Sequence, residues 1–362
     1  MRLTRLALRD FRNLPELALE TDARFVVFAG ENAQGKTNVL EAIYALATLK
    51  SFRTHKRREL LRWGQDEAVI AGTVVSEGVT RRYKLRLTAS EREPKVDDQV
   101  PRPLSSYFDG VRAVLFAPED TAMVRGEPAG RRAFVDRAAF TLRPAHLDLV
   151  RAYGRVLSQR GALLRAGGDP LQLEVLDSQL VQLGAKLSVR RDEVVAELAT
   201  PFSELYAGVS GGRSATVRYR SVLGEGDEAS RRERFLEKLA ERRDDELRRG
   251  INLVGPQRAD LDLRIEGQSA RAFGSQGQVR SVVLALKLAQ LQVADRRGLR
   301  PLFLLDDLSS ELDEHRTAHL LELLGELGLQ TFVTTTDVGR LAALPAAEQL
   351  VHRVSKGRIS RA

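Results

Sequence analysis

Two short stretches of the chain place glycine, lysine, hydroxyl and carboxylate groups at spacings suited to phosphate and metal chemistry. The first fits G-x-x-x-x-G-K-[ST] at every fixed position. Its glycines can adopt backbone angles that a Cβ would forbid, so that successive N–H groups turn toward phosphate oxygens. Its lysine can reach the β- and γ-phosphates, and its threonine hydroxyl can bind Mg²⁺. The pattern predicts a loop that binds ATP with Mg²⁺, the alternative being a chance match, and its residues are Gly30, Glu31, Asn32, Ala33, Gln34, Gly35, Lys36 and Thr37.

The second stretch is an apolar run, residues 301–305, that ends in Asp306 and Asp307. This pattern is typical of a Walker B strand. Asp306 would hold Mg²⁺ directly or through water, and Asp307 would orient or deprotonate the attacking water. An ordinary buried strand with an acidic end would look the same. Because the loop at residues 30–37 lies in the same chain, we favour the nucleotide site and assign Lys36 and Asp307 to its chemistry.

The segments around these stretches indicate an α/β domain. Residues 25–29 form an apolar run before the loop, and residues 38–49 after it have helical spacing, so a helix N-terminus would point at the phosphates. Residues 68–76 and 79–88 are rich in β-formers and flank Glu77-Gly78, which predicts a hairpin. Residues 3–9 and 111–116 also have strand character, and we expect a strand over 269–273.

Residues 120–250 change to long helical patterns, which indicates an insertion. Leucine and valine step by three and four from Leu173 to Leu198, a heptad-like seam that we expect to be internal core. The mixed charges of residues 231–249 predict an exposed helix laced with salt bridges. We therefore predict a discontinuous ATP-binding head, residues 1–119 and 251–362, with a mainly helical lid or arm at 120–250.

Composition narrows the class of protein. The 362 residues carry a formal net charge of +8 and no cysteine, which favours a polyanionic partner and a reducing cytoplasm. No run approaches the roughly 18 apolar residues of a membrane span, and no signal peptide is evident. His315 and His319 have metal-like spacing but lack the glutamate of HExxH, so we interpret them as a solvated helix face.

A basic cluster follows the loop's helix. It contains an aromatic residue and, before Glu59, no acid. It is a candidate DNA contact; the alternative is a solvated face. Its members are Arg53, Lys56, Arg57 and Arg58.

A third motif lies about 30 residues before the Walker B strand. Ser275 follows Gly274 at the start of a helical pattern, where a hydroxyl, backbone N–H groups and the positive helix end suit a γ-phosphate. An ordinary N-cap would also explain the serine. The arrangement resembles the signature motif of ABC-type ATPases, and residues 310–313 resemble their D-loop. Residues 332–337 end the next strand, where a switch residue is expected.

Together these motifs resemble the RecF family of bacterial recombination mediators, which is related to the SMC-type ATPases. The resemblance covers nearly the whole chain and predicts an ABC/SMC-type ATPase head with mixed β-sheets around the phosphate-binding core. Its motifs are Phe11-Arg-Asn13, the phosphate-binding loop, 50–55, 115–120, Arg131-Arg-x-Phe134-x-Asp136, Gly255-Pro-Gln-Arg-Ala-Asp260, Gly274-Ser-Gln-Gly-Gln278, 304–308 and 310–313.

The resemblance implies a composite site. Ser275, with Gln276, Gly277 and Gln278, would reach the γ-phosphate held by Lys36 of a second copy, so ATP would hold a homodimer together. Arg12 is also expected at the nucleotide. The implied function is ATP-dependent binding of double-stranded DNA and its junctions without sequence specificity, with RecR and RecO as partners and RecA loading as the output.

Departures and alternatives remain open. Gln257 and Ala259 stand where the family commonly has histidine and aspartate. Asp307 is one methylene shorter than the glutamate usual in ABC ATPases, which predicts slow hydrolysis; Glu119 is our candidate for the missing Q-loop residue. A nucleotide-binding subunit of an ABC transporter and a P-loop phosphotransferase are the alternative functions.

Overall fold

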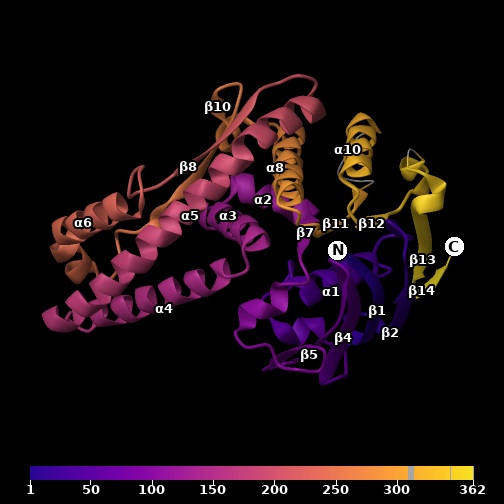
Figure 1. Ribbon diagram of the computed structural model, residues 1–362, viewed down its shortest axis with the longest axis horizontal. Helices are drawn as coiled ribbons and strands as arrows, with labels where there is room; N and C mark the ends of the chain where they lie inside the picture. Colours follow the sequence, from indigo (N-terminus) through magenta and orange to yellow (C-terminus); the bar gives the residue numbers. More distant parts are fainter. Residues whose placement is uncertain (309–313, 343, 362) are drawn as a thin grey trace. The chain divides into compact units, whose positions relative to one another are not determined.

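The computed structural model describes residues 1–308, 314–342 and 344–361, which its internal contacts divide into two units (Figure 1). The first comprises Met1–Asp120, Gly208–Gly211 and Lys287–Ala362, and the second comprises Thr121–Ala207 and Gly212–Leu286.

A six-stranded sheet forms the centre of the first unit, in the order β14-β13-β3-β12-β11-β7. The five strands from β13 to β7 run parallel, and β14 pairs antiparallel at the edge. β11 and β12 are buried along their whole length, as expected for parallel strands covered on both faces. The bounds are β3 (Phe25–Ala29), β7 (Ala113–Phe116), β11 (Leu302–Leu305), β12 (Thr331–Thr335), β13 (Gln349–Ser355) and β14 (Arg358–Arg361).

A second, antiparallel sheet has the order β2-β1-β4-β5-β6. The predicted hairpin is confirmed, because Ser76 pairs with Val79 across Glu77-Gly78. Alternate residues of β4 are buried, so that one face of the sheet lies on the core. The bounds are β1 (Arg2–Phe11), β2 (Leu14–Glu20), β4 (Glu67–Ser76), β5 (Val79–Thr88) and β6 (Arg92–Val96).

Helix α1 (Lys36–Thr48) joins the two sheets, since it packs on β12 and β7 of the first and on β1 and β4 of the second. Its apolar residues are buried around the helix, which explains why its hydrophobic pattern is broad rather than one-sided. The helix therefore starts directly at the phosphate-binding loop and is fixed by both sheets. The unit also contains the 3₁₀ helix η1 (Arg57–Leu60) and α10 (Glu314–Leu327).

The second unit is mainly helical, with a three-stranded sheet in the order β10-β9-β8. The leucine seam is internal core, as predicted: Leu180 and Leu187 of α5 are buried with Phe235 and Leu239 of α6 and Tyr153 of α4. The bounds are α2 (Thr121–Arg125), α3 (Pro128–Leu142), α4 (His146–Arg165), α5 (Pro170–Ser210), β8 (Ala215–Arg220), α6 (Glu228–Arg249), β9 (Asp260–Ile265), β10 (Gln268–Ser269), α7 (Ala270–Phe273) and α8 (Gln276–Arg296), whose last residues count with the first unit.

Two expectations are corrected. The strand expected over 269–273 is only the end of β10 followed by the short helix α7. Helix α6 is not merely an exposed, salt-bridged helix: Arg231 is 2% exposed and Glu246 is fully buried, because they pair with Asp192 and Arg160. The predicted domain limits stay a prediction. In the structure, residues 251–286 of the predicted head belong to the second unit, and the residues from Lys287 onward belong to the first.

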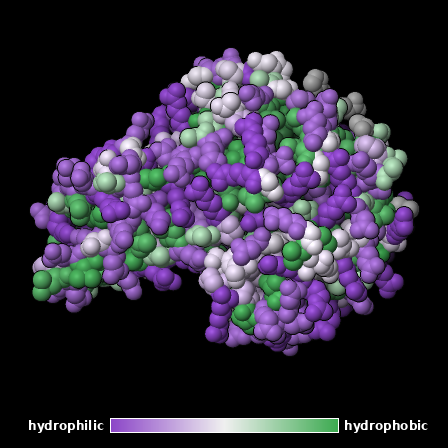
Figure 2. Space-filling view, viewed as in Figure 1, coloured by the Kyte–Doolittle hydropathy of each residue, from purple (hydrophilic) through white to green (hydrophobic). Residues whose placement is uncertain are grey.

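Hydrophilic side chains cover most of the face drawn in Figure 2. Exposed large apolar residues include Leu171 and Val175 of α5. Within the described ranges, none of the helices has the length and hydropathy to cross a membrane.

Candidate nucleotide-binding site

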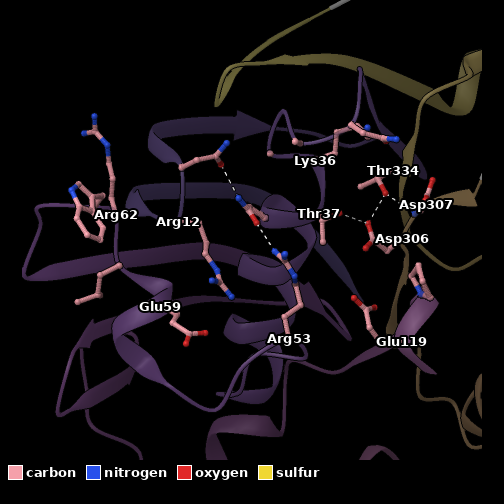
Figure 3. Close-up of a pocket in the computed structure, with 18 residues that line it drawn as sticks. Arg12, Lys36, Thr37, Arg53, Glu59, Arg62, Glu119, Asp306, Asp307 and Thr334 are labelled. Carbon is pink, nitrogen blue, oxygen red and sulfur yellow. Dashed lines mark hydrogen bonds between the residues drawn. The ribbon is translucent and has the colours of Figure 1, made fainter. Parts of the chain in front are cut away.

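A cavity of about 990 Å³ lies in the first unit where α1 begins. It is lined by residues of the phosphate-binding loop, by the carboxylates after β11 and by Thr334 of β12 (Figure 3). The carboxyl ends of these parallel strands meet at one edge of the sheet, the usual place of ligand sites in such folds. The volume suits a ligand of nucleotide size.

Close approaches explain both glycines of the loop. A Cβ at Gly30 would lie 2.3 Å from the carbonyl oxygen of Val354, in the backbone of β13. A Cβ at Gly35, whose φ is +112°, would lie 2.7 Å from Oδ1 of Asn13. A side chain at either position would push the loop away from its neighbours.

Lys36 folds back over the loop. Its Nζ donates to the carbonyl oxygens of Gly30 and Glu31, both at 2.7 Å. Burial lowers the pKa of Lys36, and the nearby charges of Asp307 and Asp306 oppose that shift. The ammonium group is thus held at the loop, where it can meet phosphate oxygens.

Asp306 gathers two hydroxyl groups from distant parts of the chain. Thr37 Oγ1 donates to Asp306 Oδ1 at 2.9 Å, and Thr334 Oγ1 donates to the same oxygen at 2.6 Å. Burial raises the pKa of Asp306, although both hydrogen bonds favour the charged form. A hydroxyl beside a buried carboxylate is a donor set that fits Mg²⁺, which prefers oxygen ligands.

Asp307 is placed by its backbone. Its φ is +53°, a conformation uncommon outside glycine, and its N–H donates to Thr334 Oγ1 at 2.8 Å. Thr334 therefore holds both carboxylate residues at once. The sequence marked this strand end as the place of a switch residue but did not single out Thr334.

A polar network that the sequence analysis did not predict supports the part of the cavity lined by Arg12, Asn13, Asn38 and Arg53. Glu41 of α1, fully buried, accepts from Arg12 Nε at 2.9 Å and Nη2 at 2.7 Å. Arg53 donates to Asn38 at 2.9 Å, and Asn38 donates to Asn13 at 2.7 Å (Figure 3). The available signal was an acid inside an otherwise apolar helix.

Gln34 and part of the basic cluster, which the sequence placed at the nucleotide and at DNA, contact other parts of the chain. Gln34 turns toward the β13–β14 connection, where its Oε1 accepts from the N–H of Lys356 at 2.7 Å. Of the basic cluster, Arg53 lines the cavity, whereas Arg57 and Arg58 donate to the carbonyl oxygens of Ser90 and Gln65. Lys56 is highly exposed, 3.8 Å from Glu59.

The predicted signature residues lie in the second unit at the start of α8. Ser275 and Gln278 form a reciprocal capping box: the Ser275 N–H donates to Gln278 Oε1 at 2.8 Å, and the Gln278 N–H donates to Ser275 Oγ at 3.2 Å. The N-cap explanation is thus satisfied, and it leaves the serine and the helix end exposed. The predicted D-loop, residues 310–313, lies outside the described residues.

Comparison with known proteins places this arrangement in a family. No family model matches the sequence. The chain is 42% identical over 366 residues to the DNA replication and repair protein RecF of Anaeromyxobacter sp. (strain Fw109-5), covering 99% of both chains. It is 39% identical to RecF of Myxococcus xanthus, covering 99% of this chain and 97% of that one. The chain belongs to the RecF family.

Solved structures agree with this family and with the predicted fold class. A structure described as the recombination mediator RecF with ATP in the RecFOR pathway matches with a TM-score of 0.89 and 26% identity, covering 100% of this chain and 99% of that one. An Smc head domain from Pyrococcus furiosus matches with a TM-score of 0.59 at 15% identity and supports the fold alone. The predicted resemblance to RecF and the ABC/SMC-type α/β head are confirmed.

Two of the RecF-family motifs, residues 131–136 and 255–260, meet in the second unit around the turn at residues 255–260. Arg131 binds Asp260 through two hydrogen bonds of 2.7 and 2.9 Å. Arg191 donates to the carbonyl oxygen of Pro256 at 2.8 Å, and Arg132 donates to that of Ala259 at 2.9 Å. The departure at Gln257 is accommodated, because its side chain accepts from Tyr153 and donates to the backbone of Val254. These motifs therefore hold the turn in place.

Proposed function

We propose that this chain is an ATP-dependent DNA-binding protein of recombinational repair and replication-fork maintenance. The contact between Thr37 and Asp306 carries the proposal, because it joins the phosphate-binding loop to the acidic end of β11 in one cavity. The RecF relatives, whose names describe DNA replication and repair, give the biological setting.

The chain's own residues would share the work of ATP binding and hydrolysis. The loop N–H groups and Lys36 would hold the phosphates, and Thr37 with Asp306 would hold Mg²⁺, which would supply positive charge to offset that of the phosphates. Asp307 orients the attacking water and accepts its proton. Because Asp307 is a short carboxylate, hydrolysis is slow and serves as a switch.

The nucleotide also controls assembly. Exposed Ser275 and the N-terminus of α8 reach the γ-phosphate bound by a second copy, where the helix end favours negative charge. ADP lacks the γ-phosphate and so lacks these contacts, and the dimer opens after hydrolysis.

DNA and partner proteins complete the proposal. A net charge of +8 favours binding to the phosphates of duplex and gapped DNA without sequence preference. RecR and RecO are the proposed partners and RecA loading is the output, in keeping with the RecFOR pathway of the solved relatives.

The test is to measure the mass of the chain in solution with ATP, ADP or no nucleotide, with and without duplex DNA. We expect dimers with ATP only, with DNA stimulating ATP turnover. Asp307→Asn keeps the side-chain size but removes the base, so its ATP dimer should persist. A monomer under every condition would contradict the assembly step, and a phosphorylated small-molecule product would favour a phosphotransferase.

A further inference from the structure

The chain contains a single tryptophan, and it faces water. Trp63 is 97% exposed, although tryptophan is a residue that proteins bury to a large extent. It also lines the same cavity as Lys36, Thr37 and Asp306. An exposed indole at the rim of a ligand cavity calls for a flat, apolar binding partner.

The backbone on both sides of Trp63 is fixed. Leu61 bridges to Phe11 of β1, and the Arg62 N–H donates to the carbonyl oxygen of Asp10 at 2.8 Å. The Gln65 N–H then donates to the carbonyl oxygen of Arg62 at 3.0 Å, which closes a four-residue turn. Gly64 in this turn has φ +81°, the value required at the third position of a type II turn. The turn places Trp63 at its second position, so hydrogen bonds fix the backbone that carries the indole.

The cavity has two chemically different ends. In Figure 3, Lys36, Thr37, Asp306 and Asp307 gather on one side, and Arg62 stands on the other side with Arg12 and Glu59 between. The first end suits phosphates and a metal ion. With the phosphates of a nucleotide at the first end, its ribose and base would occupy the rest of the same cavity, whose lining includes Leu61, Arg62 and Trp63.

We propose that Trp63 forms the base subsite of this cavity, stacking its indole on the purine ring of the bound nucleotide. This inference rests on the proposed nucleotide binding. Every base has a π-face, so stacking adds affinity without reading the base edges. Trp63 therefore strengthens binding of ATP and ADP, and purine nucleotides bind more tightly than pyrimidine nucleotides because their rings offer a larger face.

The test uses Trp63 as its own reporter, because no other residue of the chain contributes tryptophan fluorescence. Mg²⁺-ADP should quench the emission of the full-length chain, and Mg²⁺-tripolyphosphate, which lacks a base, should not. By calorimetry, Trp63→Ala should weaken Mg²⁺-ADP binding about 10-fold and leave tripolyphosphate affinity unchanged. Trp63→Phe should recover most of the ADP affinity. Leu171→Ala is the matched control, since Leu171 is also exposed, at 75%, but lies in the second unit.

The outcomes distinguish the proposed base subsite from the proposed nucleotide binding. Equal ADP affinity in wild type and Trp63→Ala would overturn the base subsite while nucleotide binding stands. Parallel loss of ADP and tripolyphosphate binding in Trp63→Ala, without recovery in Trp63→Phe, would also overturn it, because a stacking residue does not act on phosphates. Failure of the wild-type chain to bind either ligand would overturn the proposed nucleotide binding itself.

Discussion

Thr37 Oγ1 lies 2.9 Å from Asp306 Oδ1, although the two residues are 269 positions apart in the sequence. Thr37 ends the phosphate-binding motif and lies in the first turn of α1, and Asp306 follows β11. Parallel pairing of β3, β12 and β11 brings the ends of these strands to one edge. Folding of the sheet therefore brings together the two residues of the proposed metal site.

The first prediction concerns Thr334, whose hydroxyl group is hydrogen-bonded to both Asp306 and Asp307. Thr334→Val keeps the shape of the side chain but removes the hydroxyl that Asp306 and the Asp307 N–H use. We expect Mg²⁺-dependent ATP binding to weaken by roughly 10-fold, since a buried carboxylate is deprived of a hydrogen bond. Isothermal titration with Mg²⁺-ATP measures this.

A matched control lies on the same strand. The Thr331 hydroxyl is buried and meets no hydrogen-bond partner among the described residues. Thr331→Val should therefore leave ATP affinity and folding stability unchanged or slightly improve stability. Equal effects of the two substitutions would show that Thr334 acts only through packing.

The second prediction separates the cap of α8 from its proposed contact with ATP. Ser275→Asp keeps an N-cap acceptor for the Gln278 N–H but places a negative charge where the γ-phosphate of a second copy is expected. ATP binding by the monomer should stay normal and ATP-dependent dimers should disappear in sedimentation. Ser275→Arg should give the same result through bulk, and normal dimers in both variants would remove Ser275 from the interface.

The third prediction divides the basic cluster. Arg53 lines the nucleotide cavity, whereas Lys56, Arg57 and Arg58 are not among its lining residues, so these three remain the candidates for binding the phosphates of DNA. Lys56 faces solvent, and Arg57 and Arg58 would exchange their backbone carbonyl partners for phosphate oxygens. Replacing them with alanine should weaken duplex binding and lower the slope of log K against log salt by about 1 for each phosphate that is no longer neutralised. Filter binding over a salt series measures the slope.

The control for the cluster is the pair Arg248 and Arg249, exposed at the end of α6. Their replacement removes two positive charges from the second unit, against three removed from the cluster, and should leave the salt slope unchanged. An equal decrease per charge removed in both variants would mean that only net charge matters.

Sequence patterns predicted the parts of the fold that depend on local chemistry. The phosphate-binding loop, the acidic strand end and the hairpin at Glu77-Gly78 follow from spacing and turn residues. The pairing of Arg12 with Glu41 and the bridging role of Thr334 did not, because those contacts exist only after the sheets pack on α1. The wrong prediction of a strand over residues 269–273 has a different cause: a run this short fits a strand or a helical turn equally well.

The fourth prediction concerns stability of the helical unit. Asp136 of α3 accepts from Arg191 of α5 through two hydrogen bonds of 2.8 Å and contacts His146 of α4 at 3.0 Å. Burial alone would raise the pKa of Asp136, but the hydrogen bonds from His146 and Arg191 and the charge of Arg191 outweigh it and lower the pKa to about 2. Asp136→Asn would leave the nearly buried Arg191 without its charge partner, so we expect a loss of about 3 kcal/mol in the free energy of unfolding at pH 7.

The pH dependence gives this prediction its sign. A carboxyl group whose pKa is lower in the folded state stabilises the fold fully above its unfolded pKa of about 3.9, and the contribution disappears as pH falls toward 2. The difference in melting temperature between wild type and Asp136→Asn should therefore be constant near neutral pH and narrow below pH 4. Asp245→Asn is the control: the ion pairs of Asp245 with Arg242 and Arg248 lie within α6 and leave the two arginines exposed, so this substitution should cost less than about 1 kcal/mol. A difference for Asp136→Asn that stays constant down to pH 3 would mean that packing of the side chain, and not its charge, stabilises the junction of α3, α4 and α5.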